Sequence, residues 1–143
     1  MNFNRRDLGF LFLAFALTGA AAQDRTSASH TYRYEDLKVN SNGENRSRPI
    51  LNEKMHSGFG VELHETELAP GLAPHPPHRH DHEEMILIRE GSLEVTINGR
   101  SVNLGPGSVA LVASSEEHGW RNVGTTRARY FVIALGRPVP ERK

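Results

Sequence analysis

Residues 85–104 read MILIREGSLEVTINGRSVNL, and this stretch sets the expected fold. An apolar run opens it, and apolar residues then alternate with polar ones over 93–97, which is the period of a half-buried strand. Asn98-Gly99 follows at once, and this dipeptide is the strongest short signal for a hairpin turn. The stretch therefore predicts three antiparallel strands in a meander.

The same pattern of short alternating runs continues on both sides of this stretch. From residue 60 onward, short alternating apolar runs are broken by Gly, Pro or Asn, and no helical period is sustained. Further strands are expected at 108–112, 119–122 and 129–134. We therefore predict an all-β fold, a sandwich or a barrel of antiparallel strands, as a single domain over residues 60–135.

The segments that flank this domain are polar. Residues 23–59 are expected to form a polar N-terminal arm, with a possible strand at 32–39 and a loop at 41–49, where SNGENRSRP gathers turn-forming residues. Residues 136–143 carry two prolines and are expected to form a C-terminal tail.

The first 22 residues have the three-part layout of a signal peptide that is removed on export. Arg5-Arg6 precedes an apolar run at 8–17, and small residues end in Ala22. The run is about half of the roughly 20 residues that cross a bilayer, so we expect no membrane anchor. The arginine pair resembles a twin-arginine signal, although an ordinary secretory signal stays open. The protein is expected to be periplasmic or secreted.

Bulk composition excludes several classes of function. The chain has 143 residues, 17 Lys+Arg against 17 Asp+Glu, and no cysteine. A neutral chain without blocks of like charge lacks the basic footprint of nucleic-acid binding. Without cysteine there is no disulfide, thiolate metal site or cysteine nucleophile.

Residues 71–84, GLAPHPPHRHDHEE, hold the densest group of candidate ligands. In an extended segment His78 and His80 point to the same face, and Glu84 keeps that parity. Two imidazoles and a carboxylate suit a first-row divalent ion, with His118 as a fourth ligand from a later strand. A solvated, histidine-rich linker is the alternative interpretation.

Two motifs in this part of the chain resemble those of the cupin superfamily. Gly71, His78, His80, Glu84 and Gly91 follow the first motif, although Gly71 lies one residue too far upstream. Gly107, His118 and Asn122 follow the second motif, in which Ala113 replaces a proline and Ser115 a glycine. The resemblance spans about residues 60–135 and implies a small antiparallel β-barrel of the jelly-roll type, as a single domain.

The resemblance implies one mononuclear metal site inside the barrel. Its ligands would be His78, His80, Glu84 and His118, with one or two coordination positions open for water, oxygen or substrate. Manganese or iron is favoured for a protein that folds before export, and zinc, nickel, copper or cobalt are possible. Cupins of this size commonly form homodimers by exchanging N-terminal strands, so a homodimer is expected, with residues 32–39 as the exchanged segment.

Other polar residues have a plainer default interpretation. His75 and His82 are expected at the surface, His56 and His64 in the barrel wall, Trp120 in the core and Arg121 in solvent. Glu62, Glu65 and Glu67 are candidate general bases only if one of them projects into the cavity.

The sequence leaves three functions open. The first is a metal-dependent enzyme acting on a small polar molecule, of the dioxygenase, isomerase, decarboxylase or aminohydrolase type. The second is a non-catalytic module that binds or senses a metal or small ligand, and the third is a purely structural role.

Overall fold

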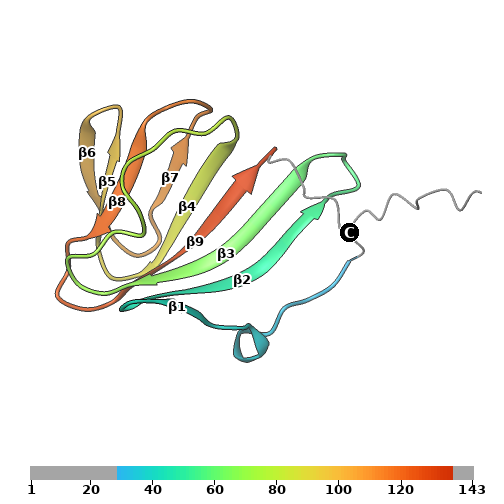
Figure 1. The fold of residues 1–143 in the computed structure, drawn as a ribbon, viewed down its shortest axis with the longest axis horizontal. Coiled ribbons are helices and arrows are strands. Elements are labelled where there is room, and N and C mark those ends of the chain that lie inside the picture. Colours follow the sequence, from blue (N-terminus) through green and yellow to red (C-terminus); the bar gives the residue numbers. More distant parts are fainter. Residues whose placement is uncertain (1–28, 137–143) are drawn as a thin grey trace, which may run out of the picture.

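Nine strands and one short helix make up the part of the chain that the structure, a computed structural model, describes, residues 29–136 (Figure 1). The expected signal peptide and most of the expected C-terminal tail lie outside these residues. Across 29–136 no helix has the length and apolar character needed to cross a membrane. The elements are η1 (Tyr34–Asp36), β1 (Asn40–Asn42), β2 (Asn45–Lys54), β3 (Gly60–Leu68), β4 (Glu83–Glu90), β5 (Leu93–Ile97), β6 (Arg100–Leu104), β7 (Val109–Val112), β8 (His118–Asn122) and β9 (Ala128–Leu135).

The strands form two antiparallel sheets. One has six strands in the order β1-β2-β3-β9-β4-β7, and the other has three in the order β6-β5-β8. Figure 1 shows the three-stranded sheet lying over one end of the longer, curved sheet. The predicted all-β antiparallel fold is confirmed.

The predicted hairpin is present, but the three-strand meander is wrong. Asn98 and Gly99 both have positive φ, 48° and 77°, and β5 pairs with β6. However, β4 pairs with β7 and β9 in the other sheet. The chain changes sheets at Gly91, whose φ is 80° and where an added Cβ would lie 2.7 Å from the Cα of Ala128. Only glycine fits this close approach, which the pattern of apolar residues does not reveal.

The expectations for the N-terminal arm are corrected in two places. Residues 32–39 contain the helix η1 and form no strand, and the expected loop at 41–49 lies mostly within β1 and β2. The two strands are joined by a turn at Gly43, with φ of 58°. The sheet therefore begins at Asn40, well before residue 60, because polar side chains can line a strand when they pair with a neighbouring strand.

The core lies between the sheets. Alternate residues of β3, β4 and β9 point inward and meet the inward face of β5 and β8, as expected for strands with one buried face. Trp120 is buried there as predicted, and its Nε1–H donates to the Tyr130 hydroxyl at 2.7 Å. The buried cluster comprises Leu68, Ile86, Ile88, Leu93, Val95, Trp120, Ala128, Tyr130 and Val132.

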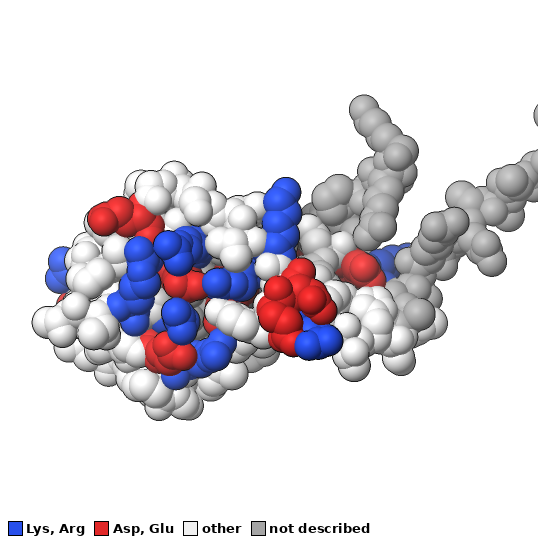
Figure 2. Space-filling view, turned by 90° about the horizontal axis from the view of Figure 1, so that it is seen from below, with Lys and Arg blue, Asp and Glu red and all other residues white. Residues whose placement is uncertain are grey.

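The outer face of the six-stranded sheet carries a network of charges. Glu65 and Glu67 are buried there and pair with Arg48, Arg89 and Arg129. Acidic and basic side chains are intermixed on the side of the molecule shown in Figure 2. Glu65 and Glu67 thus point away from the barrel interior.

Candidate metal centre

The segment that carries the two close histidines is fastened to the start of β8. His78 and His118 exchange two backbone hydrogen bonds of 3.0 Å, and Ser115 N–H donates to the carbonyl of His80 at 2.8 Å. Gly119 permits the close approach, because an added Cβ would lie 3.3 Å from the Cα of Pro77. These contacts hold a polar, proline-rich segment in one place, so it is more than a solvated linker.

All four predicted ligands are brought together. His118 enters from β8 in the three-stranded sheet, and Glu84 enters from β4 in the other. One ligand atom from each of His78, His80 and His118 lies within 4.8 Å of the others. Glu84 Oε2 lies 2.6 Å from His80 Nε2 and 3.3 Å from His118 Nε2.

Backbone carbonyls fix which ring nitrogens face the centre. His80 Nδ1 donates to the carbonyl of His82 at 2.8 Å, and His118 Nδ1 donates to the carbonyl of Glu116 at 2.9 Å. A carbonyl only accepts, so each Nδ1 carries its proton, and a neutral ring then has its lone pair on Nε2. Both lone pairs are therefore directed at Glu84, the arrangement that orients metal-binding histidines.

The centre places a carboxylate among imidazole nitrogens with little access to solvent. The His118 side chain is 0% exposed and that of Glu84 is 9% exposed. Among residues 29–136, neither His118 Nε2 nor His78 Nδ1 has a hydrogen-bond partner, although both are buried. His80 Nε2 and Glu84 Oε2 are within hydrogen-bonding distance at 2.6 Å, and a metal ion can take the place of the proton that this contact requires and bind His118 Nε2 as well. The donor set therefore fits a divalent metal ion.

His82 lies closer to the centre than expected. Its ring stacks on that of His80, with centroids 3.7 Å apart and 6° between the planes. It also forms a second possible ligand group with His80 and Glu84. Burial lowers the pKa of His82, and the neighbouring His80 lowers it further. His75 is exposed, as expected, with its ring 4.2 Å from that of His78.

Residues 64–134 match the cupin domain family. These residues form a cupin domain. Among curated relatives, the L-ectoine synthase of Bordetella parapertussis is 34% identical over 73 residues, which are 50% of this chain and 54% of that protein. The corresponding enzyme of Bordetella bronchiseptica matches to the same extent. The chain thus spans about half the length of the curated relatives that it matches.

Solved structures share the fold of this cupin domain. KdgF from Halomonas sp. superposes with a TM-score of 0.66 at 13% identity, covering 78% of this chain and 96% of that chain. A predicted oxalate decarboxylase from Thermotoga maritima gives a TM-score of 0.66 at 23% identity, covering 76% and 100%. At these identities the likeness shows the fold alone.

The two departures from the second cupin motif leave the turn intact. Ser115, which replaces glycine, has a φ of 66°, the backbone conformation that glycine favours. Ala113, which replaces proline, accepts a hydrogen bond from Glu116 N–H at 3.3 Å, closing a turn. The backbone thus presents His118 to the centre despite both substitutions.

Asn122 of the cupin motif has a structural role that sequence reasoning did not assign. Its buried amide donates to the carbonyls of Leu68 and Thr126 at 3.0 and 2.8 Å, and it accepts from Gly124 N–H at 2.9 Å. These three bonds tie the end of β3 and the β8–β9 turn to β8.

The remaining polar residues singled out from the sequence lie either in solvent or on the inner face of the large sheet. Arg121 is exposed as predicted and pairs with Glu94 at 2.8 Å, and His56 is exposed in the β2–β3 turn rather than in the barrel wall. Glu62 and His64 alternate with Glu65 along β3 and therefore lie on the inner face. Their pairing, at 3.3 Å, is a feature of the cavity that spacing alone did not identify.

Proposed function

We propose that this cupin domain holds one divalent transition metal through His78, His80, Glu84 and His118, and that the protein is an enzyme acting on a small polar molecule. The convergence of the two fixed histidine Nε2 lone pairs on the carboxylate of Glu84 carries this proposal. When bound, the metal would act as a Lewis acid toward a carboxylate or carbonyl oxygen of the substrate.

The chain's own residues would set the properties of this centre. Glu84 supplies one negative charge, so a divalent centre keeps a net positive charge that attracts anionic oxygen ligands. The carbonyls of His82 and Glu116 keep two imidazoles in the ligating tautomer and orientation. Trp120, whose ring centroid lies 5.8 Å from that of His118, belongs to the buried apolar cluster, and an apolar neighbour of this kind strengthens the electrostatic interactions of the centre.

The metal itself is proposed as manganese or iron, with zinc, nickel, copper and cobalt compatible with the same nitrogen and oxygen ligands. This preference rests on the proposed export of a folded chain by a twin-arginine route. Elemental analysis of protein recovered from the periplasm after native export tests both parts together. Predominant copper or zinc would count against folding and metal loading before export.

A second candidate function is ligand binding without turnover. A cavity of about 580 Å³ is bordered by β5, β6 and β7. Its lining combines five apolar side chains with three polar ones, which favours retention of a small ligand that has both apolar and polar groups. The residues that line it are Val95, Ile97, Asn98, Arg100, Val102, Leu104, Ala110 and Glu116.

The ligand assignment is tested by substituting two stacked histidines. His80→Ala should abolish stoichiometric metal binding, because it removes the imidazole shared by both possible ligand groups. His82→Ala is the matched control and should retain the metal, because the carbonyl that orients His80 belongs to the backbone. The measurement is metal per chain after equilibrium dialysis. Equal loss in both variants would contradict the assignment.

We also propose that the protein is a homodimer. Leu87, Val109 and Leu111 are 39%, 56% and 60% exposed on β4 and on β7, the edge strand of the large sheet. Burial of these side chains against a second copy would stabilise a pair. Light scattering should give twice the mass of the chain, and Leu111→Lys should reduce it toward the monomer.

A further inference from the structure

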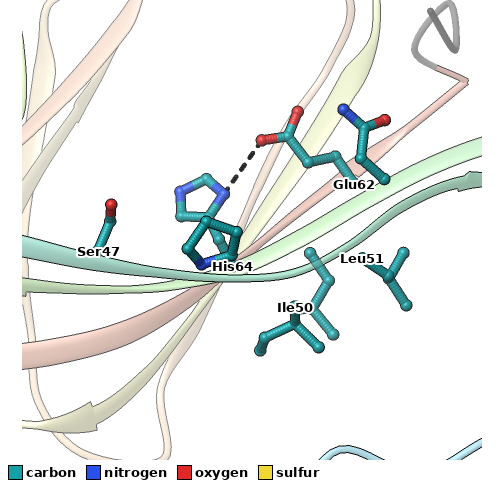
Figure 3. Close-up of a pocket in the computed structure, with 8 residues that line it drawn as sticks. Ser47, Ile50, Leu51, Glu62 and His64 are labelled. Atoms are coloured by element: carbon teal, nitrogen blue, oxygen red, sulfur yellow. Dashed lines mark ion pairs between the residues drawn. The ribbon is translucent and has the colours of Figure 1, made fainter. Parts of the chain in front are cut away.

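Glu62 and His64 form a pair on the inner face of β3. His64 Nδ1 lies 3.3 Å from Glu62 Oε1 (Figure 3). The side chain of His64 is 27% exposed and that of Glu62 is 21% exposed. In Figure 3 both side chains lie on one side of the strand, and Ile50 and Leu51 lie on the other. The pair borders a cavity of about 340 Å³ that also has Ser47 in its lining.

Strand register places this pair on the same face as the metal centre. Glu62 is opposite Ala134 on β9, and Ala134 is opposite Glu84 on β4. Directly paired residues of antiparallel strands share a face, so Glu62 and Glu84 point into the same space. Ala134 alone lies between them in this row, so the two residues are two strand spacings, about 10 Å, apart along the sheet.

The environment keeps His64 available as a base. Burial lowers the pKa of His64, and the nearby His75 lowers it further. The carboxylate of Glu84 raises this pKa but does not outweigh the effect of burial. The ring is therefore neutral near pH 7. Glu62 Oε1 is the carboxylate oxygen that faces Nδ1, and a proton on Nδ1 would leave the lone pair of the neutral ring on Nε2. This is the arrangement of a histidine base oriented by a carboxylate.

The other candidate bases of β3 cannot serve in this way. Glu65 and Glu67 lie on the opposite face and pair with arginines. Arginine side chains bind both carboxylates on that face, so neither carboxylate points into the barrel interior. Of the three glutamates considered from the sequence, Glu62 alone shares the space of the metal centre.

We propose that His64 is the general base of this site, that Glu62 positions it, and that the substrate is a small enolisable carbonyl compound such as a 2-oxo acid. This inference rests on the proposed function, because the metal would draw the substrate's oxygens toward Glu84. His64 Nε2 takes a proton from the carbon next to the carbonyl. The C–H electron pair becomes a C=C bond, and the carbonyl π pair moves to oxygen. Return of a proton to carbon completes a redox-neutral cycle.

The test follows hydrogen exchange into a defined compound. Zinc-loaded full-length protein is incubated with pyruvate in D₂O, and loss of the methyl signal is followed by proton NMR. The wild-type chain should exchange faster than the same concentration of zinc alone. His64→Gln should lose about 100-fold of that rate, the usual contribution of a general base. His56→Gln, a histidine outside the cavity, is the matched control and should keep the wild-type rate.

Two further readouts separate the possible failures. Each variant is analysed for zinc, and the tautomer of His64 is read from nitrogen-15 shifts in metal-free protein. Nδ1–H is expected in the wild-type chain and should be lost in Glu62→Leu. Exchange should fall in Glu62→Leu and recover in part in Glu62→Asp.

Each adverse result overturns a defined claim. One zinc per chain with no exchange above free zinc, or with equal rates in wild-type protein and His64→Gln, overturns this inference alone. Less than stoichiometric zinc in the wild-type chain overturns the proposed function and this inference with it.

Discussion

Ser115 adopts a backbone conformation that its side chain disfavours. Its φ is 66°, and residues other than glycine lose about 1–2 kcal/mol there through contact of Cβ with the backbone. The strain is retained beside the candidate centre, where Ser115 N–H donates to the carbonyl of His80 and its own carbonyl accepts from Arg79. The turn thus joins the two segments that supply the histidines.

Ser115→Gly should increase the free energy of unfolding by about 0.5–1 kcal/mol, since relief of Cβ strain exceeds the entropic cost of glycine. Ser114→Gly is the matched control and should decrease it by a similar amount, because Ser114 does not have positive φ. Urea unfolding of the metal-free protein measures both. Destabilisation by both substitutions would show that Ser115 is unstrained.

Residue spacing predicted the candidate ligands of the centre but not the backbone groups that orient them. His78, His80 and Glu84 are near in sequence and share parity, so a two-residue period brings them to one face. His118 is distant in sequence, so it was predicted as the remaining histidine on a later strand and through the resemblance to the second motif. The carbonyls of His82 and Glu116 could not be predicted, because every residue has a carbonyl and only the folded path selects one.

β3 shows how one strand serves two different environments. Its inner face presents Glu62 and His64 to the cavity, and its outer face presents Glu65 and Glu67 to arginines of β2, β4 and β9. Burial alone raises the pKa of Glu67, but Arg48, Arg129 and Arg46 outweigh it, and the net pKa lies below its ordinary value of 4.5. The charged form of Glu67 is therefore favoured by folding.

This linkage predicts acid sensitivity with a defined sign. Because the folded-state pKa of Glu67 is the lower one, its contribution is present above pH 4.5 and is lost as pH falls through the folded-state value. Glu67→Gln should weaken the pH dependence of stability in this acid range. It should also cost about 2 kcal/mol near pH 7, because Arg48 keeps its contact with Glu65 but loses the charge-assisted hydrogen bond to Glu67.

Glu90→Gln is the control for Glu67→Gln. Glu90 pairs with Arg129, but its side chain is 46% exposed, and an exposed pair is worth about 1 kcal/mol or less. Urea unfolding between pH 3 and 7 compares the variants. An unchanged pH dependence in Glu67→Gln would contradict the linkage.

The same network explains why the first strands were missed. β2 contains Arg46 and Arg48 opposite Glu67 and Glu65, so its outer face is charged although the strand lies within a sheet. Alternation of apolar and polar residues cannot detect such a strand. From residue 60 onward the inner face is largely apolar, and β5 to β9 were predicted close to their observed positions.

The whole molecule is two sheets joined at the candidate centre. His118 comes from the three-stranded sheet, Glu84 from the six-stranded sheet, and His78 and His80 from the connection between β3 and β4. A metal ion bound by all four would therefore link parts that otherwise meet through the apolar core. Since the ligands are brought together only by folding, metal binding should favour the folded state.

Zinc should raise the free energy of unfolding by about 4 kcal/mol when its free concentration is 1,000 times its dissociation constant. His118→Ala should lose most of this increment, because it removes the ligand of one sheet, whereas His56→Ala should retain it. The increment, rather than absolute stability, is compared, because His118 is buried and its loss destabilises the metal-free chain as well. Thermal unfolding with zinc and with a chelator measures it. Equal increments in the two variants would mean that the bound metal does not join the sheets.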